Sequence, residues 1–136
     1  RRVSSQAWNQ WPKEVESIDV SALRADLKRI KAFGKKAFIV INPSTPLVTD
    51  VLNDCDGALI MSVNPGFAGQ KFIGDVLPKI EQLKKVFNGD IAIDGGINAQ
   101  TAPLAVKAGA HVLITASFLY GSPNLNQAVS SLKSLT

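Results

Sequence analysis

The chain has 136 residues, 46% of them hydrophobic, which is enough for one domain with a single core. Its 15 Lys and Arg outnumber 11 Asp and Glu for a net charge of +4, but they form no stripe interleaved with aromatic side chains, so no nucleic-acid partner is predicted. The sequence has no long apolar run and no secretory signal, which predicts a cytoplasmic protein with no membrane partner.

The first residues differ in pattern from the rest of the chain. Residues 1–16 show neither helical nor strand periodicity, so we expect an irregular tail there and a folded β/α domain over residues 17–136. The first predicted elements of that domain are a short strand at 17–20 and a helix over 22–33 that ends at Gly34.

Four apolar, β-branched runs predict the strands of one sheet. Such runs are typical of strands buried on both faces. We expect the strands at residues 36–41, 57–63, 91–94 and 111–115, and the helices that follow them at residues 48–52, 75–87, 99–108 and 124–135. Because strands and helices alternate, the sheet is predicted to be parallel.

The unusual residues of the chain lie in the loops that follow these strands. In (β/α)8 barrels the chemistry lies at the carboxyl ends of the strands, and phosphate is often bound after the last two of them. A doubly wound open sheet also binds ligands at strand carboxyl ends and stays open as the alternative.

The most distinctive stretch is Ile91-Ala-Ile-Asp-Gly-Gly-Ile97, in which a buried strand ends in a carboxylate. An unpaired Asp94 in that place costs several kcal/mol of desolvation, so it is expected to be neutralised, paired, or used as an acid/base or metal ligand, and a simple turn or helix-cap role stays open as the alternative. Gly95 and Gly96 let backbone amides approach a ligand without Cβ atoms in the way. Cys55 has no His or Cys at ligand spacing, so we expect it to be structural.

Several motifs together resemble the ribulose-phosphate 3-epimerase family, over a span from about Leu27 to the C-terminus. The matching segments are Asn42-Pro-Ser-Thr-Pro46, Met61-Ser-Val-Asn-Pro-Gly-Phe-Ala-Gly-Gln-Lys-Phe72, Ile93-Asp-Gly-Gly-Ile97, Thr101-Ala-Pro103 and Ala108-Gly-Ala110. The segment from Met61 to Phe72 is the most specific of them.

The resemblance implies a TIM (β/α)8 barrel, of which residues 17–136 form a part with about four βα units. It implies an isomerase of the pentose phosphate pathway that interconverts D-ribulose 5-phosphate and D-xylulose 5-phosphate. Family enzymes use two aspartates on opposite faces of the sugar and a divalent metal, commonly zinc. A phosphorylated sugar is the implied partner.

The resemblance also assigns roles to individual residues. Asp94 matches an aspartate that is both an acid/base residue and a metal ligand. Met61 matches a methionine lining the site, although simple core packing is an alternative for it. The residues that match substrate-binding positions are Met61, Gly66, Phe67, Ala68, Gly69, Gly95, Gly96, Ala116 and Ser117, with Ala68 and Ala116 in places where the family often has glycine.

The chain departs from the family pattern in its metal ligands. Family members carry further His and Asp ligands in their first four βα units, but this chain has a single histidine, His111, which we interpret as a surface or strand-edge residue. Asp19 matches no catalytic motif. We therefore expect the chain alone neither to hold the metal nor to complete two-base epimerisation. A partial barrel has open sheet edges, which predicts self-association.

Two alternatives to a pentulose-phosphate epimerase stay open. One is a related barrel epimerase that acts on a hexulose phosphate such as allulose 6-phosphate. The other is a non-catalytic half-barrel that binds phosphate. The loops that read sugar length are not diagnostic in this sequence, and the glycine-rich turns satisfy all three hypotheses.

Overall fold

The computed structural model describes residues 18–67 and 69–135 and contains one four-stranded parallel sheet. The strands lie in chain order, and they are β1 (Phe38–Ile41), β2 (Gly57–Met61), β3 (Asp90–Asp94) and β4 (Val112–Ile114). The predicted parallel arrangement is confirmed, because β1 pairs with β2, β2 with β3, and β3 with β4, all in parallel register.

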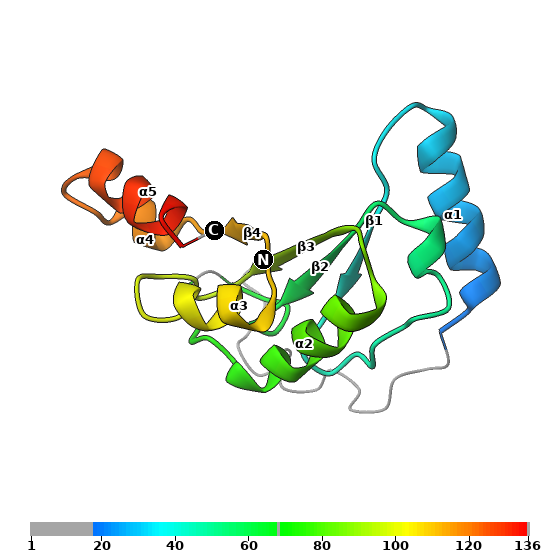
Figure 1. Ribbon diagram of the computed structural model, residues 1–136, viewed down its shortest axis with the longest axis horizontal. Coiled ribbons are helices and arrows are strands. Elements are labelled where there is room, and N and C mark those ends of the chain that lie inside the picture. The colour runs from blue at the N-terminus through cyan, green and yellow to red at the C-terminus, as the bar shows by residue number, and fades with distance from the viewer. Residues whose placement is uncertain (1–17, 68, 136) are drawn as a thin grey trace, which may run out of the picture.

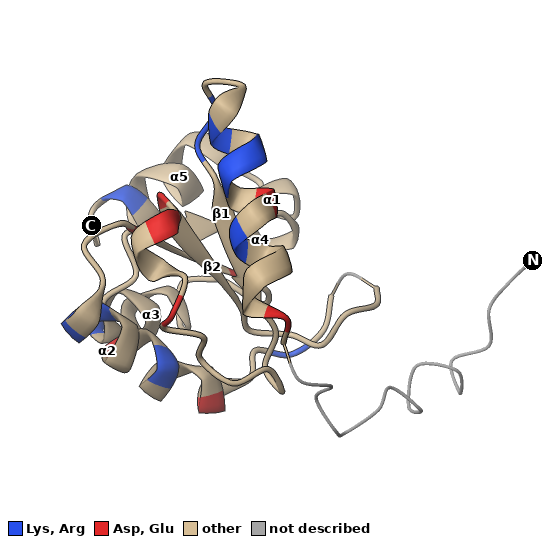
Figure 2. Ribbon diagram, turned by 90° about the vertical axis from the view of Figure 1, so that its right-hand side faces the viewer, with Lys and Arg blue, Asp and Glu red and all other residues tan. Residues whose placement is uncertain are grey.

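Helices precede the sheet, connect its strands and follow it (Figure 1). They are α1 (Val20–Ala32), α2 (Leu77–Val86), α3 (Ala102–Ala108), α4 (Ser117–Tyr120) and α5 (Leu125–Lys133), with the short 3-10 helices η2 (Leu52–Asp54) and η3 (Gly74–Val76). None of those within the described residues has the length and apolar character needed to cross a bilayer. Lys and Arg are distributed over both α1 and α2 (Figure 2).

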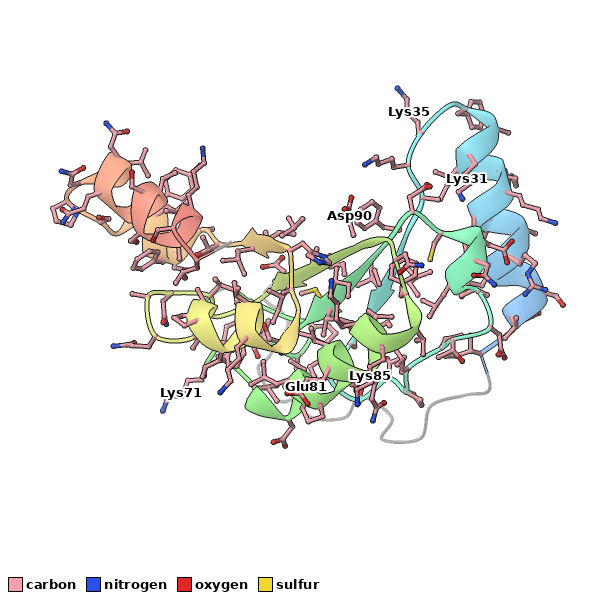
Figure 3. The ribbon with its side chains drawn as sticks, viewed as in Figure 1. Lys31, Lys35, Lys71, Glu81, Lys85 and Asp90 are labelled. Carbon is pink, nitrogen blue, oxygen red and sulfur yellow. The ribbon has the colours of Figure 1, made fainter. Side chains whose placement is uncertain are left out.

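One face of the sheet carries the core, against α2 and α3 (Figure 1). Ile60, Ile91 and Ile93 from the two central strands are fully buried there, together with Ile80 and Leu83 of α2. The opposite side of α2 is polar, and Figure 3 shows Glu81 and Lys85 pointing away from the sheet. This is the amphipathic pattern expected for a helix that covers a sheet.

The outer strands differ from the prediction that all four are buried on both faces. Phe38 and Val40 of β1 are 37% and 58% exposed, and Val112 and Ile114 of β4 are 41% and 39% exposed. Each of these strands has one neighbouring strand among the described residues, and no helix or strand of residues 18–67 and 69–135 covers the face opposite the core between α1 and α5 (Figure 1). A β-branched run therefore predicts a strand, but not how many layers cover it.

Two local predictions were wrong, and one helix was not predicted. The strand expected at 17–20 is absent over its described residues, because Asp19 caps α1 by accepting a hydrogen bond from the Ala22 amide at 3.0 Å. The helix expected at 48–52 is instead a turn followed by η2. Helix α4 was not predicted. Ser17 and the tail at 1–16 lie outside the described residues.

Candidate functional site

A cleft of about 590 Å³ opens at the carboxyl ends of β2, β3 and β4. It brings together the predicted site residues from three separate loops, which are Met61, Gly66, Phe67, Gly69, Asp94, Gly95, Gly96, Ala116 and Ser117. Ala68, the remaining predicted residue, lies outside the described residues. The cleft is therefore placed where ligands of parallel β/α proteins bind.

Asp94 is the last residue of β3 and stands in register with Met61 on β2 and Ile114 on β4. Its backbone oxygen accepts a hydrogen bond from the Ser62 amide at 2.8 Å, which fixes the end of the strand. Its side chain is half-buried and makes no hydrogen bond or ion pair with any residue in 18–67 or 69–135. The carboxylate is thus held at the cleft with its oxygens free to accept a proton or bind a cation.

The two glycines after Asp94 are required by the backbone. Gly95 has φ +119° and Gly96 has φ +63°, a region that L side chains rarely adopt. A Cβ on Gly95 would lie 2.7 Å from a methyl carbon of Val63, and one on Gly96 would lie 2.8 Å from the Phe72 amide nitrogen. The turn therefore passes too close to its neighbours for any side chain, and it exposes main chain to the cleft.

The loop after β2 forms another wall of the cleft. The Gln70 side-chain amide donates to the carbonyl oxygens of Asn64 at 2.9 Å and Phe67 at 3.0 Å, which draws the ends of the loop together. Phe67 is 68% exposed at this rim. The sequence prediction did not include Gln70, although it lies inside the most specific matching segment, because its role depends on backbone carbonyls that a motif does not display.

Other lining residues were also not predicted. They include Val63, Asn64, Pro65, Ile97, Asn98, Ile114, Thr115 and Phe118. Most of these are neighbours in sequence of the predicted residues, so proximity along the chain was the available signal. Thr115, which precedes Ala116, also donates its hydroxyl to the Ile97 carbonyl at 2.7 Å.

Two residues with reactive side chains lie away from the cleft. Cys55 is buried, its thiol lies 3.4 Å from the Leu52 carbonyl oxygen, and burial raises its pKa, so it is not poised as a thiolate. His111 is exposed just before β4, and its Nε2 lies 2.8 Å from Nζ of Lys84. Both positions agree with the structural and surface interpretations made from the sequence.

Comparison of the sequence with known proteins identifies the family of this chain. The sequence model of the Ribulose-phosphate 3 epimerase family matches residues 14–120. The ribulose-phosphate 3-epimerase of Bacillus subtilis (strain 168) is 42% identical over 119 residues, which cover 82% of this chain and 55% of that protein. The chain belongs to the ribulose-phosphate 3-epimerase family. The enzyme of that name from Methanocaldococcus jannaschii is 45% identical over 114 residues, covering 79% of this chain and 49% of its own length. The chain thus spans about half the length of the curated relatives it matches.

A solved structure supports the fold. The crystal structure of 3-hexulose-6-phosphate synthase superimposes with a TM-score of 0.56 at 19% identity, covering 88% of this chain and 58% of that chain. With the parallel sheet and its helices, this likeness confirms the prediction of a partial TIM barrel. It carries no information about the substrate of this chain.

Ribulose-phosphate 3-epimerases generally depend on a divalent metal, which is held by several side-chain ligands. The described residues contain no group of three or more His, Cys, Asp or Glu side chains that could hold an ion. Asp94 offers one carboxylate at the cleft, whereas a metal site in a protein needs three or more ligands. The described residues therefore do not make up a metal site.

Proposed function

We propose that this chain supplies the carboxyl-terminal half of a ribulose-phosphate 3-epimerase active site. In this proposal Asp94 is one of the two acid/base residues, and the glycine-rich turns with Ala116 and Ser117 bind the sugar phosphate. The observation that carries the proposal is the unpaired carboxylate of Asp94 beside the Gly95–Gly96 turn in one cleft. Membership of the family supports it.

The chemistry follows from the position of the carboxylate. In D-ribulose 5-phosphate the carbon-3 proton is next to a carbonyl, so its removal leaves an enediolate rather than an isolated carbanion. Asp94 would accept that proton as a general base. Return of a proton by Asp94 restores the same configuration, whereas inversion requires a second acid on the opposite face of the sugar. The described residues supply the first of these groups.

The turns would hold the phosphate through main-chain donors. Backbone amides at glycines can approach an anion closely because no Cβ atom intervenes. Ser117 adds a hydroxyl at the start of α4. Fixing the phosphate orients carbon 3 toward Asp94 and lowers the entropic cost of reaching the reactive geometry.

The proposal is tested by proton exchange at carbon 3. The 136-residue chain is incubated with D-ribulose 5-phosphate in deuterium oxide, and deuterium at carbon 3 is followed by NMR. We expect deuterium to enter with the configuration retained, and we expect Asp94→Asn to abolish this exchange while phosphate binding persists. Equal exchange in the wild type and the variant would exclude Asp94 as the base.

The two alternative functions give different outcomes in the same assay. A hexulose-phosphate epimerase is favoured if exchange is faster with D-allulose 6-phosphate than with the pentulose. A non-catalytic phosphate-binding half-barrel is favoured if inorganic phosphate binds but neither sugar exchanges its proton. The cytoplasmic location, and the expectation of no nucleic-acid or membrane partner, stay predictions.

Self-association through the outer strands is a separate part of the proposal. It is supported by the exposed apolar side chains of β1 and β4, two strands that each have one edge without a neighbouring strand among the described residues. We expect sedimentation at micromolar concentration to show species larger than a monomer. Val40→Lys, which places a charge on the 58% exposed position of β1, should shift the distribution toward monomer. A monomeric wild type would contradict this expectation.

A further inference from the structure

Three side-chain hydroxyls from three different elements hold three consecutive carbonyl groups of the turn after Asp94. The Ser62 hydroxyl, just past β2, lies 2.6 Å from the Gly95 carbonyl oxygen. The Thr101 hydroxyl, just before α3, donates to the Gly96 carbonyl at 2.8 Å, and Thr115, just past β4, donates to that of Ile97 at 2.7 Å. The turn is thus attached separately to the segments on both sides of β3.

The attachment of the carbonyls determines where the amides point. In a planar trans peptide the N–H lies on the side opposite to the C=O. Because the Gly95 carbonyl faces Ser62 and the Gly96 carbonyl faces Thr101, the amides of Gly96 and Ile97 face away from these hydroxyls. Neither amide donates to an acceptor within residues 18–67 and 69–135, and both residues line the cleft. Two neighbouring amide donors are therefore left unsatisfied beside the carboxylate.

Two of the hydroxyls, those of Ser62 and Thr101, are well placed to act on the backbone and poorly placed to act on a ligand, whereas Thr115 lines the cleft. Ser62 is fully buried, and its single proton is shared between Gly95 and the Asp94 carbonyl oxygen at 2.9 Å. The Thr101 hydroxyl has two further contacts, since its oxygen accepts from the Asn98 amide at 3.0 Å and lies 3.4 Å from Oδ1 of Asn98. Neither Ser62 nor Thr101 lines the cleft. The Ser62 hydroxyl contacts the carbonyls of Asp94 and Gly95, and the Thr101 hydroxyl contacts Gly96 and Asn98.

We infer that Ser62, Thr101 and Thr115 are positioning residues that fix the Gly95–Ile97 turn so that the Gly96 and Ile97 amides form a preorganised pair of donors for an anion. The ligand class is a phosphate monoester, because two adjacent N–H groups match two phosphate oxygens. The inference rests on the proposed function, since it deepens the assignment of the phosphate-binding turn. It adds to that assignment the residues whose hydroxyls set the geometry of the turn.

A matched pair of variants at Thr101 isolates the hydroxyl. Thr101→Val keeps the shape and removes the hydrogen bond, whereas Thr101→Ser keeps the hydroxyl and removes a methyl group. Ser62→Ala provides a second loss of a hydroxyl. Ser131→Ala is the control, because the Ser131 hydroxyl makes the same kind of bond to the Ala128 carbonyl, at 2.7 Å, on α5 and away from the cleft.

The experiment is a titration of the isotope-labelled chain with inorganic phosphate, in which the Gly96 and Ile97 amide signals report the position of the turn. We expect both amides to move downfield in the wild type. We expect Thr101→Val and Ser62→Ala to weaken phosphate binding about 3- to 10-fold and to shift both amide signals in the free protein. Thr101→Ser and Ser131→Ala should behave as the wild type.

The outcomes separate this inference from the proposed function. If the wild type binds phosphate and Thr101→Val binds it equally well with unchanged amide signals, the positioning role is wrong and the phosphate site stands. If the wild type does not bind phosphate, the proposed function fails, and the role of the turn as an anion site fails with it. A loss of thermal stability in Thr101→Val without a change in affinity also overturns the inference, because it indicates a purely structural bond.

Discussion

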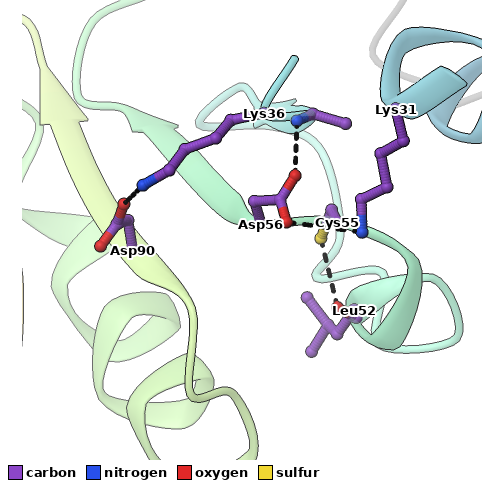
Figure 4. Close-up of polar contacts among 7 residues, drawn as sticks. Lys31, Lys36, Leu52, Cys55, Asp56 and Asp90 are labelled. Atoms are coloured by element: carbon purple, nitrogen blue, oxygen red, sulfur yellow. Dashed lines mark hydrogen bonds and ion pairs between the residues drawn. The ribbon is translucent and has the colours of Figure 1, made fainter. Parts of the chain in front are cut away.

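The aspartates at the two ends of the sheet differ in whether their carboxylates are paired. At the amino end, Asp56 accepts a hydrogen bond from the Ala37 amide at 2.7 Å and lies 3.5 Å from Lys31, and Asp90 lies 3.4 Å from Lys36 (Figure 4). At the carboxyl end, Asp94 has no partner among the described residues. The same strand, β3, thus begins with a paired aspartate and ends with an unpaired one.

This difference indicates a division of work within the fold. Pairing at the amino end contributes to stability, whereas the free carboxylate at the other end keeps its oxygens available to a ligand. In barrels of this kind, residues at the carboxyl ends of the strands serve chemistry and those at the amino ends serve stability. Four substitutions test the division, and they are taken from the largest expected effect to the smallest.

Asp94→Asn should abolish proton exchange and leave the stability of the fold almost unchanged. Removing a general base costs about 10²- to 10⁴-fold in rate, so proton exchange at carbon 3 should fall below detection. Because the carboxylate has no partner to lose, unfolding in urea should change by less than about 0.5 kcal/mol. Asp90→Asn is the control at the other end of β3 and should keep full exchange. A large loss of stability in Asp94→Asn would refute the proposed division.

Gly96→Ala should lower both the stability of the fold and the affinity for phosphate. An Ala there has to adopt φ +63° with its Cβ 2.8 Å from the Phe72 amide nitrogen, which should cost about 1–3 kcal/mol of unfolding free energy. Displacing the Gly96 amide should weaken phosphate binding about tenfold or more. Gly74→Ala is the matched control, since no atom lies within 4 Å of its Cβ position. Equal effects of the two substitutions would contradict the required close approach.

Asp56→Asn should change the dependence of stability on pH. The hydrogen bond from the Ala37 amide, aided by the charge of Lys31, holds the pKa of Asp56 below its usual value. The resulting stabilisation is fully present above about pH 5 and is lost as the pH falls through about 3.9 and below. The variant should therefore be less stable than the wild type at pH 7, and the two should converge in acid.

Urea unfolding measured from pH 7 down to acid gives this difference directly. Asp26→Asn serves as the control, because Asp26 is exposed and its pair with Arg29, at 3.6 Å, lies on the surface of α1. A constant difference between Asp56→Asn and the wild type over the whole pH range would mean that the Asp56 charge does not stabilise the fold.

The sequence predicted the carboxyl end better than the amino end. Asp94 and its glycines could be found because a charge at the end of a buried run is rare, and because glycine at a turn reports a backbone constraint. The contacts of Asp56 with Ala37 and Lys31 join residues 19 and 25 positions apart and depend on how α1 lies against the sheet. The exposure of Val40 was missed for a similar reason, since burial depends on neighbours that a strand pattern does not contain.

Lys36→Met tests the ion pair with Asp90, which we expect to contribute least to stability at the amino end of the sheet. The Lys36 and Asp90 side chains are 74% and 47% exposed, and pairs so open to water contribute about 0.2–1 kcal/mol. We expect the loss of unfolding free energy to stay below about 1 kcal/mol and to shrink as salt is added, because salt screens exposed charges. Lys35→Met is the matched control, since the neighbouring Lys35 forms no ion pair with the described residues (Figure 3). If both variants lose the same stability at low salt, the pair with Asp90 contributes nothing, and stabilisation at the amino end rests on Asp56.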